Sequence, residues 1–254
     1  MINLGRNVGE EGEVFFKAFI LQQMDLGNTI HPFGKIVSID FGPALSIPKW
    51  LPKYNKLLAA KDYVSLKSIF PKAPGGYKAD IGINGVNYSL KYKGGAKSAI
   101  VNHTSRRGFL RICDHLGLDI KTLDNIINEY WIKREAGLIT EDVSNSHPES
   151  PFKNHENYLD SILKYFLFDG TGSKDSEFKA DKVIVFSDPL DSSTYNILSK
   201  DDVVNHIWDS LVFSLRSKKG MPSNYSSEVD GDLTPWIRYR PGDENPKGAL
   251  HIRT

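Results

Sequence analysis

The chain has 254 residues, and its 32 lysines and arginines nearly balance its 31 acids, so the net charge is +1. A hydrophobic content of 40% and a charged content of 25% are those of an ordinary globular protein that can bury a substantial core. The near-zero charge argues against a strongly basic, tail-like nucleic-acid binder, although it leaves room for a locally basic cleft.

The single cysteine and the distribution of apolar residues further limit the class of protein. Cys113 is the only cysteine, so an intrachain disulfide and a cysteine-based zinc site are excluded. The start of the chain lacks the apolar run of a signal peptide, and no stretch of 18 apolar residues offers a membrane span. We therefore expect a cytoplasmic protein with no membrane partner.

The first half of the chain is predicted to contain several helices and one hairpin. Helices are expected at residues 10–24, 55–70, 106–117 and 121–136, and a short strand at 35–39 within a proline-rich stretch. A β-hairpin is expected at 77–93, because Asn84-Gly85 favours a two-residue type I′ turn.

The second half is predicted to mix strands and helices. The expected elements are a polar surface loop at 140–151, a helix at 155–168, a buried strand at 182–187, a helix at 200–216, and a two-stranded ribbon made by 236–240 and 249–253. This order of elements predicts an α/β fold in which 1–254 form a single domain.

The predicted hairpin gathers chemistry-bearing side chains on one face. A turn at Asn84-Gly85 sets Asp80 opposite Ser89 and puts Lys91 on the same side, two residues further along. An acid, a hydroxyl and a lysine within reach of one ion suit metal-dependent cleavage of phosphodiesters. The alternative is a half-exposed hairpin with an ordinary polar face.

The sequence around the hairpin is strongly basic. From Lys72 to Arg111 there are eight basic residues and one acid, Asp80, so the segment carries +7 (8 − 1). Such a field attracts a polyanion. The candidates for contacts with phosphates or bases are Lys93, Lys97, Asn102, His103, Ser105, Arg106, Arg107 and Arg111. For each of these residues alone, a solvated surface position is the alternative.

The spacing Asp80…Ser89-Leu90-Lys91 resembles the PD-(D/E)xK signature, in which an acid on one strand and an acid–x–lysine on the next build a magnesium site. The wider context is similar to compact type II restriction endonucleases of the HinP/Msp kind. It comprises Gly76–Asp80, Leu90-Lys91, Ser105–Phe109 and the carboxyl segments Trp236–Asp243 and Ala249–Arg253. The resemblance implies a restriction-endonuclease-like core, a mixed sheet with a β-hairpin active site flanked by helices.

The resemblance also implies an activity, the Mg²⁺-dependent, sequence-specific cleavage of double-stranded DNA. Asp80 and the Leu90 carbonyl would hold the ion, and Lys91 would lie beside the attacking water. The chain departs from the family at Ser89, where Glu, Gln or Asn is usual, because a hydroxyl is a poorer magnesium ligand.

An acid from the amino-terminal helix is expected to compensate for Ser89. Glu13 is the first choice, because members of the family often add an acid from this helix, and Glu10 and Glu11 are its neighbours. The alternative is that these acids only complement the helix dipole at the surface.

The resemblance assigns residues 1–150 mainly to the catalytic core and residues 151–254 to a strand, a helix and the terminal ribbon, which contribute to DNA recognition. On the ribbon, Arg238 and Arg240 read guanines or brace phosphates, and Asp243 reads a base edge. Whether the protein is a monomer or a homodimer stays open.

Three other functions compete with this interpretation. One is a PD-(D/E)xK nuclease without fixed specificity, and another is a DNA-binding module that has lost its chemistry, as Ser89 suggests. The third is a metal-dependent sugar phosphatase, because Asp188-Pro-Leu-Asp191 resembles a metal motif of that family. Ser192 replaces the usual glycine of that motif, so residues 188–194 are interpreted as a turn that ends a strand and caps a helix.

Overall fold

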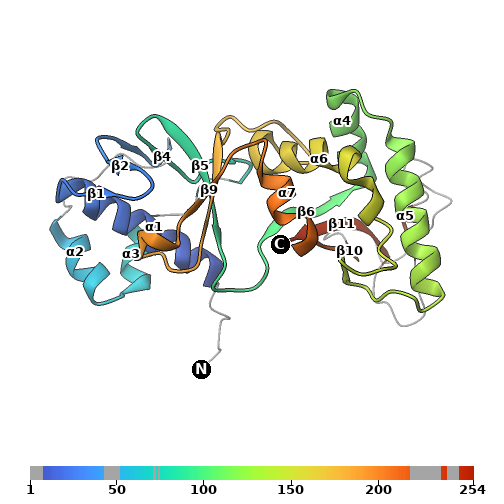
Figure 1. The fold of residues 1–254 in the computed structure, drawn as a ribbon, viewed down its shortest axis with the longest axis horizontal. Coiled ribbons are helices and arrows are strands. Elements are labelled where there is room, and N and C mark those ends of the chain that lie inside the picture. The colour runs from blue at the N-terminus through green and yellow to red at the C-terminus, as the bar shows by residue number, and fades with distance from the viewer. Residues whose placement is uncertain (1–7, 43–51, 71–72, 74, 218–235, 239–245) are drawn as a thin grey trace. The chain divides into compact units, whose positions relative to one another are not determined.

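The structure is a computed structural model that describes residues 8–42, 52–70, 73, 75–217, 236–238 and 246–254 (Figure 1). The fold is mixed α/β, as expected. The chain divides into two compact units. Unit 1 comprises 1–98, 167–169 and 176–203, and unit 2 comprises 99–166, 170–175 and 204–254. The single-domain organisation stays a prediction, and each unit is described by itself.

Unit 1 contains a five-stranded mixed sheet in the order β3-β4-β5-β8-β9. Its strands are β3 (Ile39–Asp40), β4 (Ile81–Ile83), β5 (Val86–Tyr92), β8 (Lys182–Phe186) and β9 (Asn196–Leu198). β5 is antiparallel to β4 and parallel to β8, so the predicted hairpin lies in the middle of the sheet. Residues 35–39 are not one strand. Lys35 ends β2 (Gly34–Lys35), which pairs with β1 (Thr29–Ile30), and Ile39 begins β3.

In the part of unit 1 that the structure describes, the α-helices are α1 (Val8–Asp25), α2 (Pro52–Ala59) and α3 (Tyr63–Ile69) (Figure 1). The helix expected at 10–24 is confirmed by α1. The helix expected at 55–70 is two helices, because Lys61 adopts a φ of 53° and Asp62 caps α3 through the Ser65 N–H. On α1, Phe16 packs against Phe186 of β8, with ring centroids 5.0 Å apart, so α1 covers the apolar face of the sheet.

Unit 2 contains a four-stranded antiparallel sheet in the order β6-β11-β10-β7. Its strands are β6 (Ala99–Ser105), β11 (Lys247–Arg253), β10 (Val212–Ser217) and β7 (Val143–Ser144). The prediction of a helix at 200–216 is correct only for its first part. α7 (Val203–Ile207) and a 3₁₀ turn (Trp208–Ser210) lead into β10, where buried Phe213 and Leu215 alternate with the polar side chains of the opposite face.

Of the expected terminal ribbon, the strand at 249–253 is confirmed, and residues 239–240 of its other strand lie outside the described residues. β11 includes residues 249–253, but it is an inner strand that pairs with β6 on one side and β10 on the other. Arg238 forms an antiparallel bridge with Lys247, with backbone hydrogen bonds of 3.0 and 2.9 Å. Arg240 and Asp243 lie outside the described residues.

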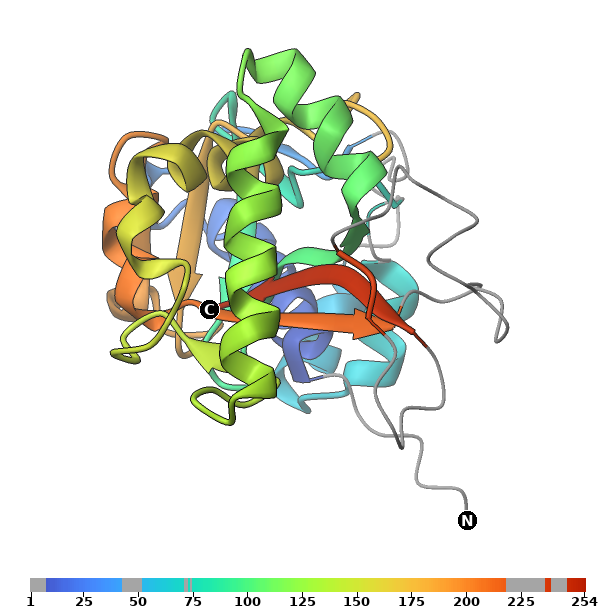
Figure 2. The ribbon, with the colours of Figure 1, turned by 90° about the vertical axis from the view of Figure 1, so that its right-hand side faces the viewer.

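The helices of unit 2 include α4 (Arg106–Leu116), α5 (Ile120–Glu135) and α6 (Glu156–Lys164), which confirm three expected helices. α6 follows a 3₁₀ turn (Lys153–His155) and continues into a π turn (Tyr165–Asp169). Figure 2 shows α5 crossing in front of β10 and β11. Phe152 stacks on Phe213 of β10 at 4.0 Å, and the Trp131 Nε1–H of α5 donates to the Trp236 carbonyl.

The segment 140–151 is only partly the surface loop that its polarity predicts. It contributes β7, and the side chains of Val143, Asn145 and Ser150 are buried. Among the helices that the structure describes, none has the length and apolarity needed to cross a membrane.

Candidate active site

The hairpin has the register that its turn predicts. Ile81 pairs with Tyr88, and Ile83 pairs with Val86. Asn84 and Gly85 have φ angles of 51° and 79°, the positive values that a type I′ turn requires. The apolar face of the hairpin packs into the core of unit 1, so the polar face is held on a rigid support.

Asp80 lies at the point where the backbone pairing of the hairpin ends. Its N–H donates to the Tyr88 carbonyl at 2.8 Å. Its carboxylate Oδ2 accepts the Leu90 N–H at 2.7 Å and lies 3.5 Å from the Ser89 hydroxyl. The structure therefore brings Asp80 and Ser89 together, through the side chain of Asp80 rather than through strand pairing.

The Leu90 carbonyl lies on the same side of β5 as Asp80, because the N–H and the C=O of one strand residue point the same way. In a regular hairpin, Ala79 would donate to this carbonyl. Here the Ala79 N–H donates to the Phe178 carbonyl at 3.1 Å instead. The Leu90 carbonyl has thus lost its regular partner beside the Asp80 carboxylate.

The oxygen atoms around Asp80 fit a magnesium ion that is bound by few protein groups. Mg²⁺ in phosphate-processing sites is held by one or two carboxylates, with waters and substrate phosphates completing the octahedron. Asp80 supplies a carboxylate, Leu90 a carbonyl, and buried Ser89 a neutral oxygen. Within the described ranges, no group of three or more His, Cys, Asp or Glu side chains could hold a metal ion.

Two lysines accompany Asp80. Lys91 lies on β5 next to Val185 of β8, two residues from Ser89. Lys78 lies two residues before Asp80. Burial lowers the pKa of its ammonium group to about 8, and the charge of Lys91 acts in the same direction while Asp80 opposes it. Lys78 was not among the site residues expected from the sequence.

The acids of α1 have separate environments. Glu13 is partly buried on α1. Glu10 pairs with Lys67 of α3 at 2.9 Å. Glu11 lines a pocket with Asp188. Glu13 as a metal ligand stays a prediction.

The basic segment around the hairpin is divided between the two units. Lys93 and Lys97 are exposed residues of unit 1 that follow β5. The candidates that fall in unit 2 are Asn102, His103, Ser105, Arg106, Arg107 and Arg111. Asn102 and His103 are exposed on β6, and Ser105 is the N-cap residue of α4.

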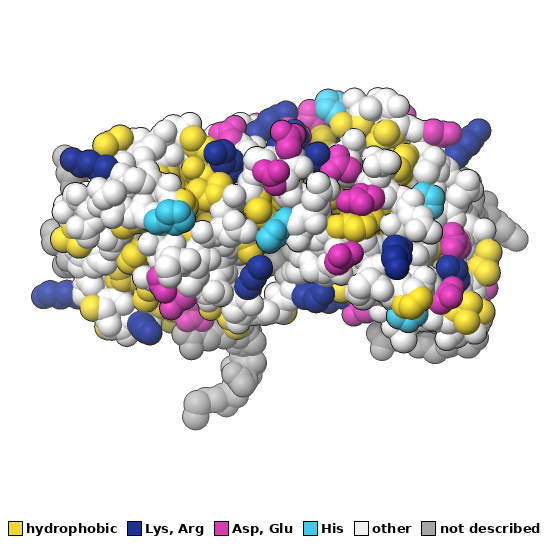
Figure 3. Space-filling view, viewed as in Figure 1, with side chains coloured by type: hydrophobic (Ala, Val, Ile, Leu, Met, Phe, Trp, Pro, Cys, Tyr) yellow, Lys and Arg dark blue, Asp and Glu magenta, His cyan; other side chains and the backbone are white. Residues whose placement is uncertain are grey.

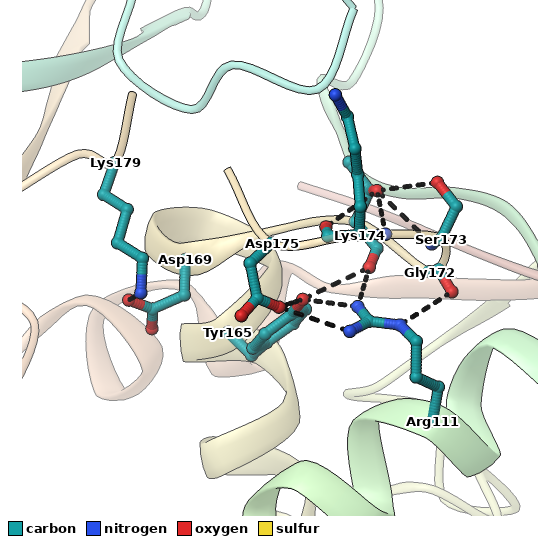
Figure 4. Close-up of polar contacts among 9 residues, drawn as sticks. Arg111, Tyr165, Asp169, Gly172, Ser173, Lys174, Asp175 and Lys179 are labelled. Atoms are coloured by element: carbon teal, nitrogen blue, oxygen red, sulfur yellow. Dashed lines mark hydrogen bonds and ion pairs between the residues drawn. The ribbon is translucent and has the colours of Figure 1, made fainter. Parts of the chain in front are cut away.

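Two arginines of α4 are held by partners inside unit 2. The guanidinium of Arg106 makes two hydrogen bonds to the Asp124 carboxylate, at 2.8 and 2.7 Å. The guanidinium of Arg111 contacts the Tyr165 hydroxyl and the Asp175 carboxylate, as Figure 4 shows, and it also donates to the Thr171 carbonyl at 2.6 Å. Either residue would have to exchange these partners to bind a phosphate.

The remaining recognition candidate, Arg238, donates through Nη1 to the Ile237 carbonyl at 3.0 Å. On the face drawn in Figure 3, basic and acidic side chains are interspersed.

The phosphatase-like motif is a pair of local turns. The Asp188 carboxylate accepts the Leu190 N–H at 2.8 Å, and the Asp191 carboxylate accepts the Ser193 N–H at 2.9 Å. Asp191 caps the 3₁₀ helix Ser192–Thr194 directly after β8. The interpretation of this segment as a turn with a helix cap is confirmed.

Comparisons of the chain with protein-family models, with curated proteins and with solved structures give no match.

Proposed function

We propose that this protein is a Mg²⁺-dependent endonuclease that cleaves double-stranded DNA, of the PD-(D/E)xK kind and similar to type II restriction enzymes. One observation carries the proposal. A single hairpin holds the Asp80 carboxylate against the Leu90 backbone and the Ser89 hydroxyl, with Lys91 on the same strand.

The sheet that carries the hairpin supports the proposal. β5 lies between antiparallel β4 and parallel β8, which is the mixed arrangement expected of a restriction-endonuclease-like core. α1 covers the apolar face of this sheet, and the candidate residues extend from the other face. A site on inner strands is held more precisely than a site on loops.

In the proposed mechanism, Asp80 and the Leu90 carbonyl would hold Mg²⁺. When bound, the ion supplies Lewis-acid stabilisation of the phosphoryl oxygens and a more acidic water. Lys91 orients the attacking water, and its ammonium group stabilises the charge that develops on the phosphate. Ser89 offers a neutral oxygen beside Asp80 and adds no charge.

A second candidate function is a DNA-binding module without catalysis. The observation that favours it is Ser89 itself, because a hydroxyl replaces the second acid of the signature and the described residues contain no three-donor metal group. A nuclease of the same superfamily without fixed specificity is a further alternative.

The test is to incubate the protein with phage DNA and Mg²⁺ and to separate the products on a gel. Discrete bands that disappear with EDTA support the sequence-specific endonuclease. A smear indicates a nuclease without fixed specificity. Intact DNA together with a mobility shift would contradict catalysis and favour the binding module.

A further inference from the structure

Unit 1 contains an open pocket that the proposed nuclease site does not use. Its volume is about 320 Å³, at the lower end of the range of small-molecule sites. Its walls come from α1, from the link between α2 and α3, from the end of β5 and from the turn after β8. The lining residues that matter for its chemistry are Glu11, Phe15, Lys61, Tyr92, Asp188 and Leu190.

The pocket lies on the side of the sheet that faces away from the candidate active site. Successive side chains of a strand alternate between its faces, so Tyr92 at the end of β5 points away from the face that holds Lys91. The Tyr92 ring lies 5.4 Å from the ring of Phe186 in the core. A Cβ atom at Gly12 of α1 would lie 2.5 Å from Cγ of Tyr92, so α1 packs closely on this tyrosine. The pocket is therefore a second site in unit 1.

The wall formed by residues 188–190 is fixed by hydrogen bonds. Oδ1 of Asp188 accepts the Leu190 N–H at 2.8 Å, and the Asp188 N–H donates to the Thr194 hydroxyl at 3.2 Å. The Tyr195 hydroxyl donates to the Pro189 carbonyl at 2.6 Å. Within the described ranges, no cation forms an ion pair with Asp188, so its second carboxylate oxygen can bind a ligand.

The pocket carries charges of both signs. Glu11 and Asp188 supply carboxylates, and Lys61 supplies an ammonium group. The exposed side chain of Lys61 makes no hydrogen bond or ion pair with the part of the chain that the structure describes. Lys61 also has a φ of 53°, a left-handed conformation that asparagine or glycine adopts more readily. Its ammonium group therefore stands at the pocket without an ion pair to either acid.

This combination of charges favours a ligand that carries both signs. A purely anionic ligand would pair with Lys61 but would also meet two carboxylates, whereas a purely cationic ligand would leave Lys61 unpaired. A zwitterion satisfies both sides, because its carboxylate can accept from Lys61 while its ammonium group donates to Asp188. The apolar surface of Phe15, Tyr92 and Leu190 suits an aliphatic or aromatic group.

We propose that this pocket binds a free α-amino acid with an apolar side chain, whose carboxylate is held by Lys61 and whose ammonium group is held by Asp188. The negative charge of Glu11 adds to the attraction for the ammonium group. The inference goes beyond the proposed nuclease function and does not depend on it, because the pocket shares no residue with the site at Asp80.

Isothermal titration calorimetry of the whole chain with L-phenylalanine and L-leucine tests the proposal. Each amino acid is compared with an analogue that lacks the ammonium group, phenylpropionate or isocaproate, and with one that lacks the carboxylate, phenethylamine or isoamylamine. At least one amino acid should bind saturably, and about tenfold or more tightly than either of its analogues, because each charged group contributes a charge-assisted hydrogen bond. Saturable binding by neither amino acid would overturn the proposal, and so would an amine that binds as tightly as its amino acid.

Three variants test the assigned contacts. Lys61→Asn removes the ammonium group and suits the left-handed backbone, so it should fold and bind the amino acid about tenfold or more weakly, while binding of the amine analogue does not weaken. Asp188→Asn keeps an oxygen that accepts the Leu190 N–H, and it should weaken the amino acid by a similar factor without weakening the carboxylate analogue.

Lys56→Gln is the matched control, because Lys56 is an exposed lysine on α2 of the same unit and does not line the pocket. It should bind the amino acid as wild type does. Thermal unfolding checks that each variant is folded. Wild-type affinity in folded Lys61→Asn and Asp188→Asn proteins would contradict the proposed contacts.

Discussion

The carboxylate of Asp80 takes over the backbone pairing of Leu90. Its Oδ2 accepts the Leu90 N–H at 2.7 Å, at the position where regular hairpin pairing stops. Asp80 thereby has a structural bond as well as a proposed metal-binding role. Substitutions that keep the shape of the Asp80 side chain can separate its structural role from its proposed metal-binding role.

Asp80→Asn should keep the bond to Leu90, because the amide oxygen can still accept the N–H, yet it should abolish cleavage by removing the charge that holds Mg²⁺. Asp80→Ala should abolish cleavage as well and also lower the free energy of unfolding by about 1–2 kcal/mol, since the Leu90 N–H loses its acceptor. Both variants should still bind DNA in Ca²⁺. Cleavage assays and urea unfolding check these outcomes, and full activity of Asp80→Asn would refute the metal-ligand assignment.

Ser89 should contribute less than either charged group of the site. Ser89→Ala removes a neutral oxygen that lies 3.5 Å from Asp80, so its cleavage rate should fall by less than about tenfold. If Glu13 is the compensating acid, Glu13→Gln should cost more than Ser89→Ala. Single-turnover rates at saturating Mg²⁺ compare the two. A wild-type rate in Glu13→Gln would contradict the assignment of Glu13 as a metal ligand.

The hairpin could be predicted because its signals are local. Asn84-Gly85 dictates the turn, and the two-residue alternation around it fixes which side chains share a face with Asp80. The end of the pairing at Ile81 could not be predicted, because it depends on Phe178, which is distant in sequence and takes the N–H of Ala79. The environment of Lys78 was missed for the same reason.

β10 was missed because its pairing is distant in sequence. Residues 203–207 do form a helix, and the strand pattern that follows, in which Phe213 and Leu215 alternate with polar residues, is too short to fix the element by itself. The strand depends on pairing with β11, in which Phe213 lies opposite Ile252. The partners of Arg106 and Arg111 are likewise tertiary contacts, so the sequence alone left both residues as candidates for phosphate binding.

Arg106 should behave as a structural residue. Its side chain and that of Asp124 are each 14% exposed, and Asp124 also accepts the Nε1–H of Trp236 at 2.7 Å. Arg106→Ala leaves this carboxylate without its cation, so the free energy of unfolding should fall by about 2–3 kcal/mol.

The salt slope of DNA binding should not change in Arg106→Ala. Arg107→Ala is the matched control, because Arg107 is the next residue of α4 and is exposed. Arg107→Ala should leave stability near wild type and, if Arg107 contacts a phosphate, lower the salt slope by about one. A stable Arg106→Ala protein with a reduced slope would instead support a phosphate contact at Arg106.

His251 should make the stability of the protein sensitive to acid. Its ring meets that of His103 edge to face at 4.7 Å, between strands β11 and β6. Burial, together with the charges of the neighbouring His103, Arg253 and Arg216, lowers the pKa of His251 to about 4. The folded protein therefore holds this imidazole neutral, while the unfolded chain binds a proton near pH 6.5.

Because the unfolded state binds more protons than the folded state between about pH 6.5 and pH 4, the contribution of His251 is present above pH 6.5 and is lost as the pH falls through this window. The loss should amount to about 1–2 kcal/mol in the free energy of unfolding, after allowance for solvent. His251→Gln cannot take up this proton, so its urea-unfolding curves should change less between pH 6.5 and pH 4. His206→Gln, at an exposed position on α7, is the control and should follow wild type. An acid dependence that is the same in wild type and in His251→Gln would show that other groups cause the acid sensitivity.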